Sequence, residues 1–350
     1  MTNFPEPREP AGQVDPTVPT ADTGAAQPAD GYASAVSVTN PDDAAARRLR
    51  ALLRSGGVRG SFGRLGEIAG WASAVQGRCP PRRFARVRLL RIGPASAQTD
   101  ALAEEAGATV RPVEVGASVE SADAAGRGSV DAEVDAGADL FIPAAPVTGI
   151  AAAAAAVAAL TSTEPVAVLG WPTAVLHPDP DPLAEGWEAD DDFTEADGKS
   201  DDDRTDADVT EVDDDAWMQA VASIRDALRR VGSHFPDASD VLREVGDPAL
   251  AAVTGMLVQA AARRTPVLLD GVTSGAAALL AHDLAPGADR WWLASHRSPW
   301  PAHRLALERL DLEPMVDFAV AREEGVGALL ALPLLQAAVT LVAGSVEPRC

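Results

Sequence analysis

The chain has 350 residues, 47% of them hydrophobic, so it can bury a large core and is expected to form one sizeable α/β domain with a smaller appendage. Its formal net charge is −23 and no basic stripe with interleaved aromatic residues occurs, which excludes the common modes of nucleic-acid binding. Lys199 is the only lysine, and this excludes lysine Schiff-base chemistry in the core.

The cysteines and the N-terminal residues predict a cytoplasmic protein. Cys79 and Cys350 are too few for a disulfide framework and lack the spacing of metal ligands. The residues that follow Met1 contain neither the basic nor the apolar region of a secretory signal.

The first 80 residues are predicted to lie outside the main domain. Residues 1–40 mix Pro, Ala, Thr, Asp and Gly without a period, which is typical of a disordered tail. Residues 41–80 are expected to form a helical appendage, because helical patterns occur at 44–53 and again at 65–71. This appendage should pack on an α/β domain at 81–346.

The next segments alternate between strand-like and helical patterns. Strands are predicted at 84–92, 107–115, 138–142 and 165–170, and helices at 99–106 and 150–160. Strand, helix, strand is the unit of a doubly wound, mostly parallel sheet with helices on both faces. Apolar and basic residues alternate in part along 84–92, and this favours a position near a sheet edge.

An acidic insert at 179–213 then interrupts the α/β domain. Between Asp179 and Asp215 the chain has 18 Asp or Glu residues against Lys199 and Arg204, so most of the net charge belongs to this segment. Low hydrophobicity and high like charge predict a solvated, disordered loop. A Ca²⁺ site around Asp201 is the alternative, but the Gly and Glu of an EF-hand loop are not at the required spacing.

The remainder of the chain returns to ordered patterns. Helices are predicted at 214–231, 241–263, 274–281 and 325–346, and strands at 266–269 and 290–294. The last helix contains no charged residue and is long enough to cross a membrane. Pro333, Gln336 and the cytosolic type of fold favour a buried core helix instead.

Four polar or glycine-bearing turns separate the apolar segments of the last quarter of the chain. They are Asp270-Gly271, Ser295-His-Arg-Ser298, Leu312-Glu-Pro314 and Glu323-Glu-Gly-Val-Gly-Ala328. Each would fall where a strand ends or a helix begins, which is where open α/β sheets bind ligands.

The last of these turns is the strongest candidate for catalysis. Gly325 and Gly327 would present free backbone N–H groups at a helix N-terminus, a natural phosphate site, with Glu324 above it. The adjacent carboxylates Glu323 and Glu324 can raise each other's proton affinity, which suits a general base near neutral pH. An acidic helix start that complements the helix dipole explains the same residues.

The other turns offer binding groups. Ser295 and Ser298, with the arginine between them, could bind an anion, and Asp270 is either a ligand contact or an ordinary Asp-Gly turn. A metal site from His296 and His303 lacks a third ligand, and a Ser-His nucleophile lacks the glycine pattern of a nucleophile elbow. No metal and no cofactor are predicted.

Taken in order, these motifs resemble the nicotinate-nucleotide:dimethylbenzimidazole phosphoribosyltransferase family of cobalamin lower-ligand assembly. The resemblance extends from about Ser61 to Val346 and is densest over 247–335, where the four turns occur in family order. It is also visible at 61–71 and in Gly137-Ala-Asp-Leu-Phe-Ile-Pro143.

The resemblance implies a reaction at C1′ of nicotinate mononucleotide. A benzimidazole nitrogen displaces nicotinate and gives an α-ribazole phosphate, while a glutamate that matches Glu324 takes the azole proton. The same match places Gly325, Gly327 and Ser298 near the nucleotide phosphate, with Asp270 and Ser295 as further substrate contacts. The family also implies a homodimer.

Several ligand-facing segments depart from the family pattern. Ala144-Ala-Pro-Val-Thr-Gly149 replaces a Gly-Glu-Met-Gly-Ile-Gly-Asn-Thr-Thr loop, and Gly93-Pro-Ala-Ser-Ala-Gln98 replaces a segment that shapes the base pocket. Val326 takes the place of a hydroxyl residue between the glycines. These departures lead to an alternative hypothesis, that the chain is a catalytically impaired homologue acting as a binding or regulatory partner.

Overall fold

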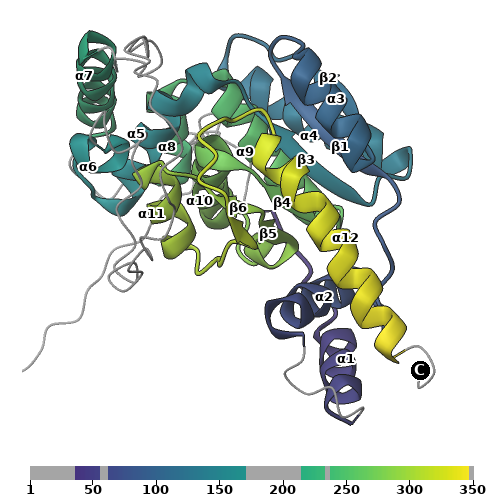
Figure 1. Cartoon of the computed structure of the whole chain (residues 1–350). Coiled ribbons are helices and arrows are strands. Elements are labelled where there is room, and N and C mark those ends of the chain that lie inside the picture. The colour runs from purple at the N-terminus through teal and green to yellow at the C-terminus, as the bar shows by residue number, and fades with distance from the viewer. Residues whose placement is uncertain (1–35, 56–61, 171–213, 233–236, 347–350) are drawn as a thin grey trace, which may run out of the picture. The chain divides into compact units, whose positions relative to one another are not determined.

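The fold is built on a parallel sheet of five strands in the order β2-β1-β3-β4-β5 (Figure 1). The computed structural model describes residues 36–55, 62–170, 214–232 and 237–346. The strands are β1 (Val87–Ile92), β2 (Ala108–Val113), β3 (Leu140–Ala144), β4 (Val267–Leu269) and β5 (Trp292–Ala294). A second, two-stranded parallel sheet pairs β6 (His296–Arg297) with β7 (Val316–Asp317).

The strand order reverses between β1 and β3. Val87 of β1 pairs with Ala108 of β2 on one side and with Leu140 of β3 on the other. All neighbouring pairs are parallel, so the carboxyl ends of the strands meet at one edge. In open α/β sheets this reversal is the topological switch point, where a crevice forms for ligands.

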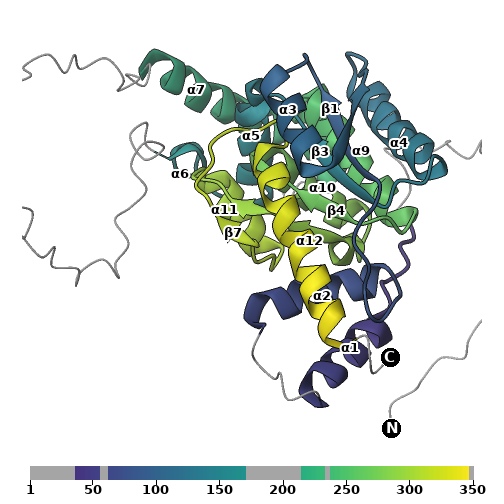
Figure 2. The same cartoon turned by 45° about the vertical axis from the view of Figure 1, so that its right-hand side comes forward.

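Helices cover both faces of the five-stranded sheet, as expected for a doubly wound fold (Figures 1 and 2). One face carries α4 (Val119–Asp135), α9 (Pro248–Ala262) and α10 (Gly271–Leu284), and the other carries α3 (Ala97–Ala106) and α12 (Val326–Val346). Helices α9 and α10 are apolar nearly all round because almost every one of their residues is buried.

Two glycines allow α4 and α9 to cross closely. A Cβ at Gly126 of α4 would lie 2.1 Å from the carbonyl oxygen of Ala252, and one at Gly255 of α9 would lie 2.5 Å from that of Asp123. The backbones therefore touch at this crossing, and any side chain there would push the two helices apart.

The remaining helices lie at the two ends of the sheet. They are α1 (Asp43–Ser55), α2 (Gly63–Val75), α5 (Ile150–Thr161), α6 (Pro165–Leu169), α7 (Asp214–Val231), α8 (Ala238–Val245) and α11 (Pro301–Arg309), with short 3₁₀ turns at Val147–Gly149 and Ala288–Trp291. Helices α1 and α2 pack with the end of α12 around Leu49, Ala69, Val342 and Val346. Both α1 and α2 lie within residues 41–80, whose assignment as a separate helical appendage stays a prediction.

Helix α12 is a core helix, as its sequence predicted. By length and composition it is the one described helix that could cross a membrane, but 56% of its apolar window is buried inside the protein. It packs against α2 and α3, and its buried residues include Ala328, Leu332 and Gln336. The Gln336 side chain bonds to the backbone of Phe84, accepting from its N–H and donating to its carbonyl oxygen.

The strand predicted at 84–92 is β1, which lies near the sheet edge but not at it, because β2 is the edge strand and β1 lies between β2 and β3. Its basic residues are instead neutralised by neighbouring helices. Arg88 donates to Glu133 of α4 over 2.8 Å, and Arg91 pairs with Asp100 of α3. These ion pairs explain why basic and apolar residues alternate along a strand that is not at the edge of the sheet.

Two further predictions of secondary structure differ from the structure, and two helices were missed. Residues 165–170 form α6 rather than a strand, since Pro165 occupies a first helical position. The helix expected at 241–263 is two helices, broken where Gly246 adopts a φ of 72° and Asp247 caps α9. Helices α4 and α11 were not predicted, because their small and charged residues give a weak apolar period.

Residues 1–35 of the predicted tail and all of the acidic insert lie outside the described residues, so these parts stay predictions. The tail boundary at residue 40 is wrong, because residues 36–40 bond to the domain: the N–H of Val36 donates to the carbonyl oxygen of Leu284 over 3.3 Å, and Nε1 of Trp291 donates to that of Thr39 over 2.9 Å. The described residues on either side of the insert are joined, however. The indole Nε1 of Trp217 in α7 donates to the carbonyl oxygen of Gly170 over 2.9 Å.

Candidate active site

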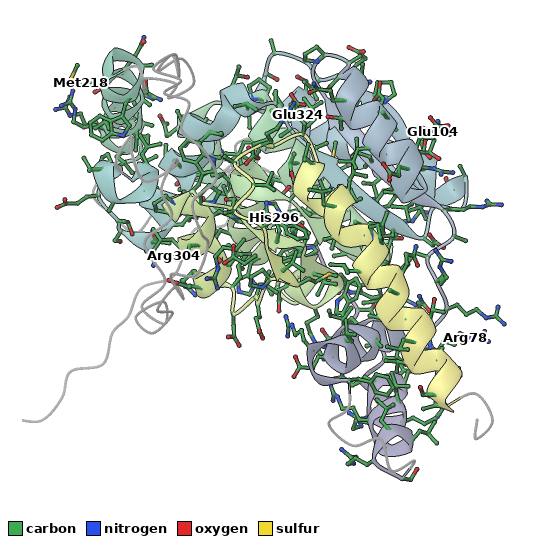
Figure 3. All side chains as sticks on the ribbon, viewed as in Figure 1. Arg78, Glu104, Met218, His296, Arg304 and Glu324 are labelled. Atoms are coloured by element: carbon green, nitrogen blue, oxygen red, sulfur yellow. The ribbon has the colours of Figure 1, made fainter. Side chains whose placement is uncertain are left out.

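Glu324 lies at the switch point of the sheet. Its backbone N–H donates to the carbonyl oxygen of Ala145, just after β3, over 3.1 Å. Its Oε2 accepts from the hydroxyl of Thr99, in the first turn of α3 after β1, over 3.3 Å. The side chain is 26% exposed, and Figure 3 shows it in the loop that precedes α12. The carboxylate is therefore both anchored and accessible.

Arg322 lies beside this carboxylate at the surface. Its Nη2 is 3.7 Å from Oε2 of Glu324, and its Nη1 donates to Oε1 of Gln98 over 3.0 Å. The guanidinium thus links the loop before α12 to the start of α3. Glu324 has a cation on its exposed side and a hydroxyl donor on its buried side.

Asp270 is buried at the exit of β4 and caps α12. Its Oδ2 accepts from the backbone N–H of Gly325 over 3.0 Å, and its Oδ1 accepts from that of Ala328 over 2.8 Å. Although Asp270 immediately precedes α10, its side chain makes no capping bond to that helix. Burial raises the pKa of this carboxyl to about 7, against the lowering effect of the N–H donors.

Glu323 makes the complementary contact. Its Oε1 accepts from the N–H of Val272 over 2.8 Å and its Oε2 from that of Thr273 over 3.2 Å, which satisfies the first turn of α10. Burial, and then the nearby charge of Asp270, raise the pKa of Glu323 to about 7. The pair of interacting carboxyls is therefore Glu323 with Asp270, and not Glu323 with Glu324 as the sequence suggested.

The two glycines do not present free N–H groups, so that prediction is wrong for this structure. The N–H groups of Gly325 and Gly327 both interact with the carboxylate of Asp270. Steric fit accounts for the glycines instead. Gly325 has a φ of 83° and a Cβ there would lie 2.6 Å from Leu89, while a Cβ at Gly327 would lie 2.1 Å from the ring of His296.

Ser295 and Ser298 are buried and bonded to histidines. The hydroxyl of Ser295 lies 3.0 Å from Nδ1 of His296, which is itself 3.7 Å from Oδ1 of Asp270. The N–H of Ser298 donates to Nδ1 of His303 over 3.2 Å, and its hydroxyl lies 2.9 Å from the same nitrogen. Burial lowers the pKa of His296 and lowers that of His303 to about 3, so His303 is neutral at physiological pH.

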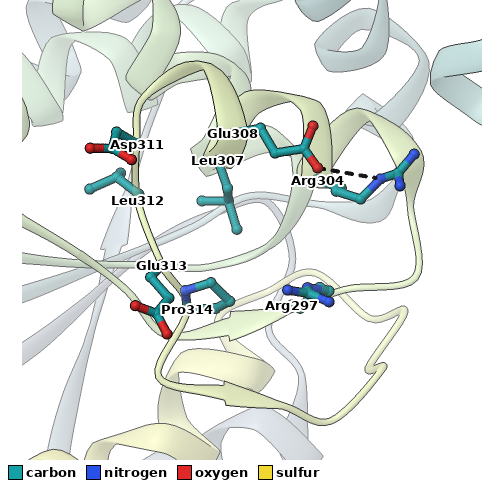
Figure 4. A pocket seen from close by; sticks show the side chains of 8 residues that line it. All are labelled: Arg297, Arg304, Leu307, Glu308, Asp311, Leu312, Glu313 and Pro314. Atoms are coloured by element: carbon teal, nitrogen blue, oxygen red, sulfur yellow. Dashed lines mark ion pairs between the residues drawn. The ribbon is translucent and has the colours of Figure 1, made fainter. Parts of the chain in front are cut away.

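Arg297 lines a surface groove of about 320 Å³ (Figure 4), whereas these serines are buried. The groove is also lined by Arg304, Glu308 and the Leu312-Glu-Pro314 turn. Arg297 pairs with Asp317 over 3.4 Å. The serines and the arginine of this turn therefore do not converge on one anion, as the sequence had suggested.

The structure links Asp270 to Gly325 and Gly327 directly and to Ser295 through His296, whereas Ser298 is bonded to His303. Sequence reasoning missed Thr99 and the capping role of Glu323. The Ser96-x-x-Thr99 spacing signalled a helix start, and Ser96 does accept from Thr99 N–H over 3.3 Å, but nothing local indicated the distant glutamate. Among the described residues, no group of three or more His, Cys, Asp or Glu side chains is placed to hold a metal ion.

Open parallel sheets bind ligands in the crevice at the switch point, and here an anchored, accessible carboxylate lies there. The comparisons specify the class, since a family model described as a phosphoribosyltransferase matches residues 202–347. The nicotinate-nucleotide–dimethylbenzimidazole phosphoribosyltransferase of Mycobacterium ulcerans is 37% identical over 338 residues, covering 80% of this chain and 84% of the relative. The protein of that name from Mycobacterium tuberculosis is 36% identical over 360 residues, covering 86% and 90%. The chain belongs to this family.

Solved structures agree with the fold. The crystal structure of the protein of the same name from Thermus thermophilus has a TM-score of 0.65 and 24% identity, and covers 86% of this chain and 96% of that one. A second structure from that organism, titled CobT, has a TM-score of 0.64 and covers 84% and 96%. These relatives and structures carry the enzyme's name and give no support to the alternative of an impaired homologue.

Proposed function

We propose that this protein transfers the phosphoribosyl group of nicotinate mononucleotide to a benzimidazole and so produces an α-ribazole phosphate. The observation that carries the proposal is the position of Glu324. It is the accessible carboxylate at the switch point of the sheet, held by Thr99 and Ala145, whereas the neighbouring Glu323 is buried and engaged in a helix cap. Family membership supplies the substrate class.

The reaction needs one base and good positioning. The benzimidazole nitrogen attacks C1′ of the ribose, the bond from C1′ to the pyridinium nitrogen breaks, and nicotinate leaves with that electron pair. The azole N–H proton passes to the Glu324 carboxylate. The departing ring nitrogen becomes neutral and therefore needs no general acid. General-base catalysis by one well-placed group raises a rate by about 10²–10⁴-fold.

Phosphate contacts from Gly325, Gly327 and Ser298 also belong to this proposal, but they carry a cost. The N–H of Gly325 is engaged by Asp270 and the donors of Ser298 by His303. A phosphate that used them would have to displace those bonds. Asp270 and Ser295 act in the proposal by shaping the site, since both side chains are buried.

The test is nicotinate release from nicotinate mononucleotide in the presence of dimethylbenzimidazole. Glu324→Gln removes the base with little change of shape and should lower kcat by 10²-fold or more. Glu104→Gln is the matched control, because Glu104 is an exposed glutamate on α3 outside the site (Figure 3). Wild-type protein that releases no nicotinate, and shows no thermal shift with either ligand, would contradict the proposal.

A homodimer, predicted from the resemblance, and a cytoplasmic location, predicted from the cysteines and the N-terminal residues, accompany this function. Light scattering after size-exclusion chromatography would measure the first. A mass of one chain, about 36.1 kDa, would contradict it.

A further inference from the structure

We propose that Glu323 is a positioning residue, which holds the turn that carries Glu324 by exchanging helix caps with Asp270. The inference rests on the proposed function, because it assigns Glu324 as the base. Glu323 then affects the reaction only by holding the neighbouring Glu324 in place.

The exchange of caps joins two helices that are distant in sequence. Asp270 stands before α10 but accepts from the N–H of Gly325, which immediately precedes α12, and from that of Ala328 in its first turn. Glu323 stands before α12 but accepts from the first N–H groups of α10, at Val272 and Thr273. Each carboxylate therefore satisfies the orphan donors of the other helix, and neither helix start can move without breaking bonds at both.

The packing around the exchanged caps leaves little room for a second arrangement. Gly271 has a φ of 49°, and a Cβ there would lie 2.2 Å from Oε1 of Glu323. A Cβ at Gly325 or Gly327 would overlap Leu89 or His296. Close packing on three sides means that the turn has one well-defined position while both caps are intact.

Glu324 depends on this position. It has a φ of 69°, in the left-handed region that a residue with a side chain seldom adopts unless its neighbours hold it there. Glu323 is held immediately before it and Gly325 immediately after it, each by one of the exchanged caps. If the first cap is lost, the backbone can relax to a negative φ, and the Glu324 carboxylate then turns away from Thr99.

The test separates kcat from KM in nicotinate release. Glu323→Ala removes both acceptor oxygens and should lower kcat at least tenfold, while KM for nicotinate mononucleotide changes less than threefold. Glu323→Gln keeps the volume and one acceptor oxygen, so it should restore most of kcat. Val130→Ala, which shortens a buried side chain of α4 away from the turn, is the control for lost stability. Each variant is assayed at the same number of degrees below its own Tm.

Amide exchange gives a readout that does not need turnover. In Glu323→Ala, exchange should rise at least tenfold in the first turns of both α10 and α12, and it should stay unchanged there in Val130→Ala. Equal kcat in wild type and Glu323→Ala, or unchanged exchange at Gly325, would overturn the inference. If wild type has no turnover but exchange rises as expected, the proposed function fails and the positioning of the turn stands.

Discussion

Asp270 and Glu323 cap each other's helices, and both carboxyl groups are buried as a consequence. Asp270 accepts from Gly325 and Ala328 at the start of α12, where Gly325 is the residue before the helix. Glu323 accepts from Val272 and Thr273 of α10. Burial raises the pKa of each to about 7, and for Glu323 the charge of Asp270 adds to the effect. The two carboxyl groups that cap the helix starts therefore resist ionisation in the folded state.

The first prediction concerns the pH dependence of stability. The pKa of Glu323 is about 7 in the folded state and near its ordinary value of 4.5 when unfolded, so the folded state binds more protons between these values. Its contribution to the free energy of unfolding therefore falls as pH rises through this range. In urea titrations, the stability of wild type minus that of Glu323→Gln should decrease from about pH 4.5 to about pH 7.5. A difference that increases with pH would contradict the assignment.

The opposite sign is expected for His303. Its folded pKa is about 3, below the ordinary value of 6.5, so the folded state binds fewer protons between these values. Stability is fully present above pH 6.5 and is lost as pH falls, by about 2 kcal/mol at about pH 5. His303→Asn keeps an acceptor for the N–H of Ser298 but cannot titrate. Its free energy of unfolding should change less between about pH 7.5 and about pH 5 than that of wild type.

Glycine positions in α12 provide a matched pair. A Cβ at Gly327 would lie 2.1 Å from the ring of His296, whereas one at Gly344 would meet nothing within 4 Å. Gly327→Ala should lower the free energy of unfolding by about 1–3 kcal/mol, because the buried ring has to move. Gly344→Ala should leave it unchanged or raise it by up to about 1 kcal/mol, since alanine favours the helix. Equal effects of the two changes, measured by urea unfolding, would argue against the packing at His296.

Thr99 is predicted to orient the base. Its hydroxyl donates to Oε2 of Glu324, and a hydrogen bond to a charged group contributes about 1.5–3 kcal/mol. Thr99→Val should therefore lower kcat/KM for nicotinate release roughly tenfold or more. Thr254→Val is the control, because Thr254 is also buried in a helix but its hydroxyl donates to Leu250 within α9. The hypothesis fails if the two variants have the same kcat/KM.

The acidic insert is predicted to be dispensable for the fold. The described residues on its two sides are joined by the bond from Trp217 to Gly170, so a short connection can replace it. Replacing residues 179–213 by a Gly-Ser linker of about six residues should leave the free energy of unfolding unchanged or raise it by about 1 kcal/mol, because a shorter loop costs less entropy to close. Loss of cooperative thermal unfolding would show that the insert belongs to the fold.

The parallel sheet and its main helices could be predicted because their signals are local. The apolar patterns of the strand at 138–142 and of the helices at 150–160 and 325–346 agree with the elements that the structure forms there. Where the pattern was ambiguous, context decided. Residues 165–170 contain two valines and suggested a strand, but 165–169 form α6, and the carbonyl oxygen of Gly170, which ends this helix, accepts from Trp217 in a distant helix.

The site shows the same division. The amino-acid sequence was enough to indicate the family, the order of the four turns and Glu324 as the candidate base. The roles of the other polar groups could not be predicted in this way, because their hydrogen-bond partners lie far apart in the chain and depend on how α10 and α12 meet. The fold directs Asp270 to the N–H groups expected for phosphate and places Arg297 at a surface groove. A buried carboxylate takes the nearest unsatisfied donors, and sequence spacing does not reveal which donors those are.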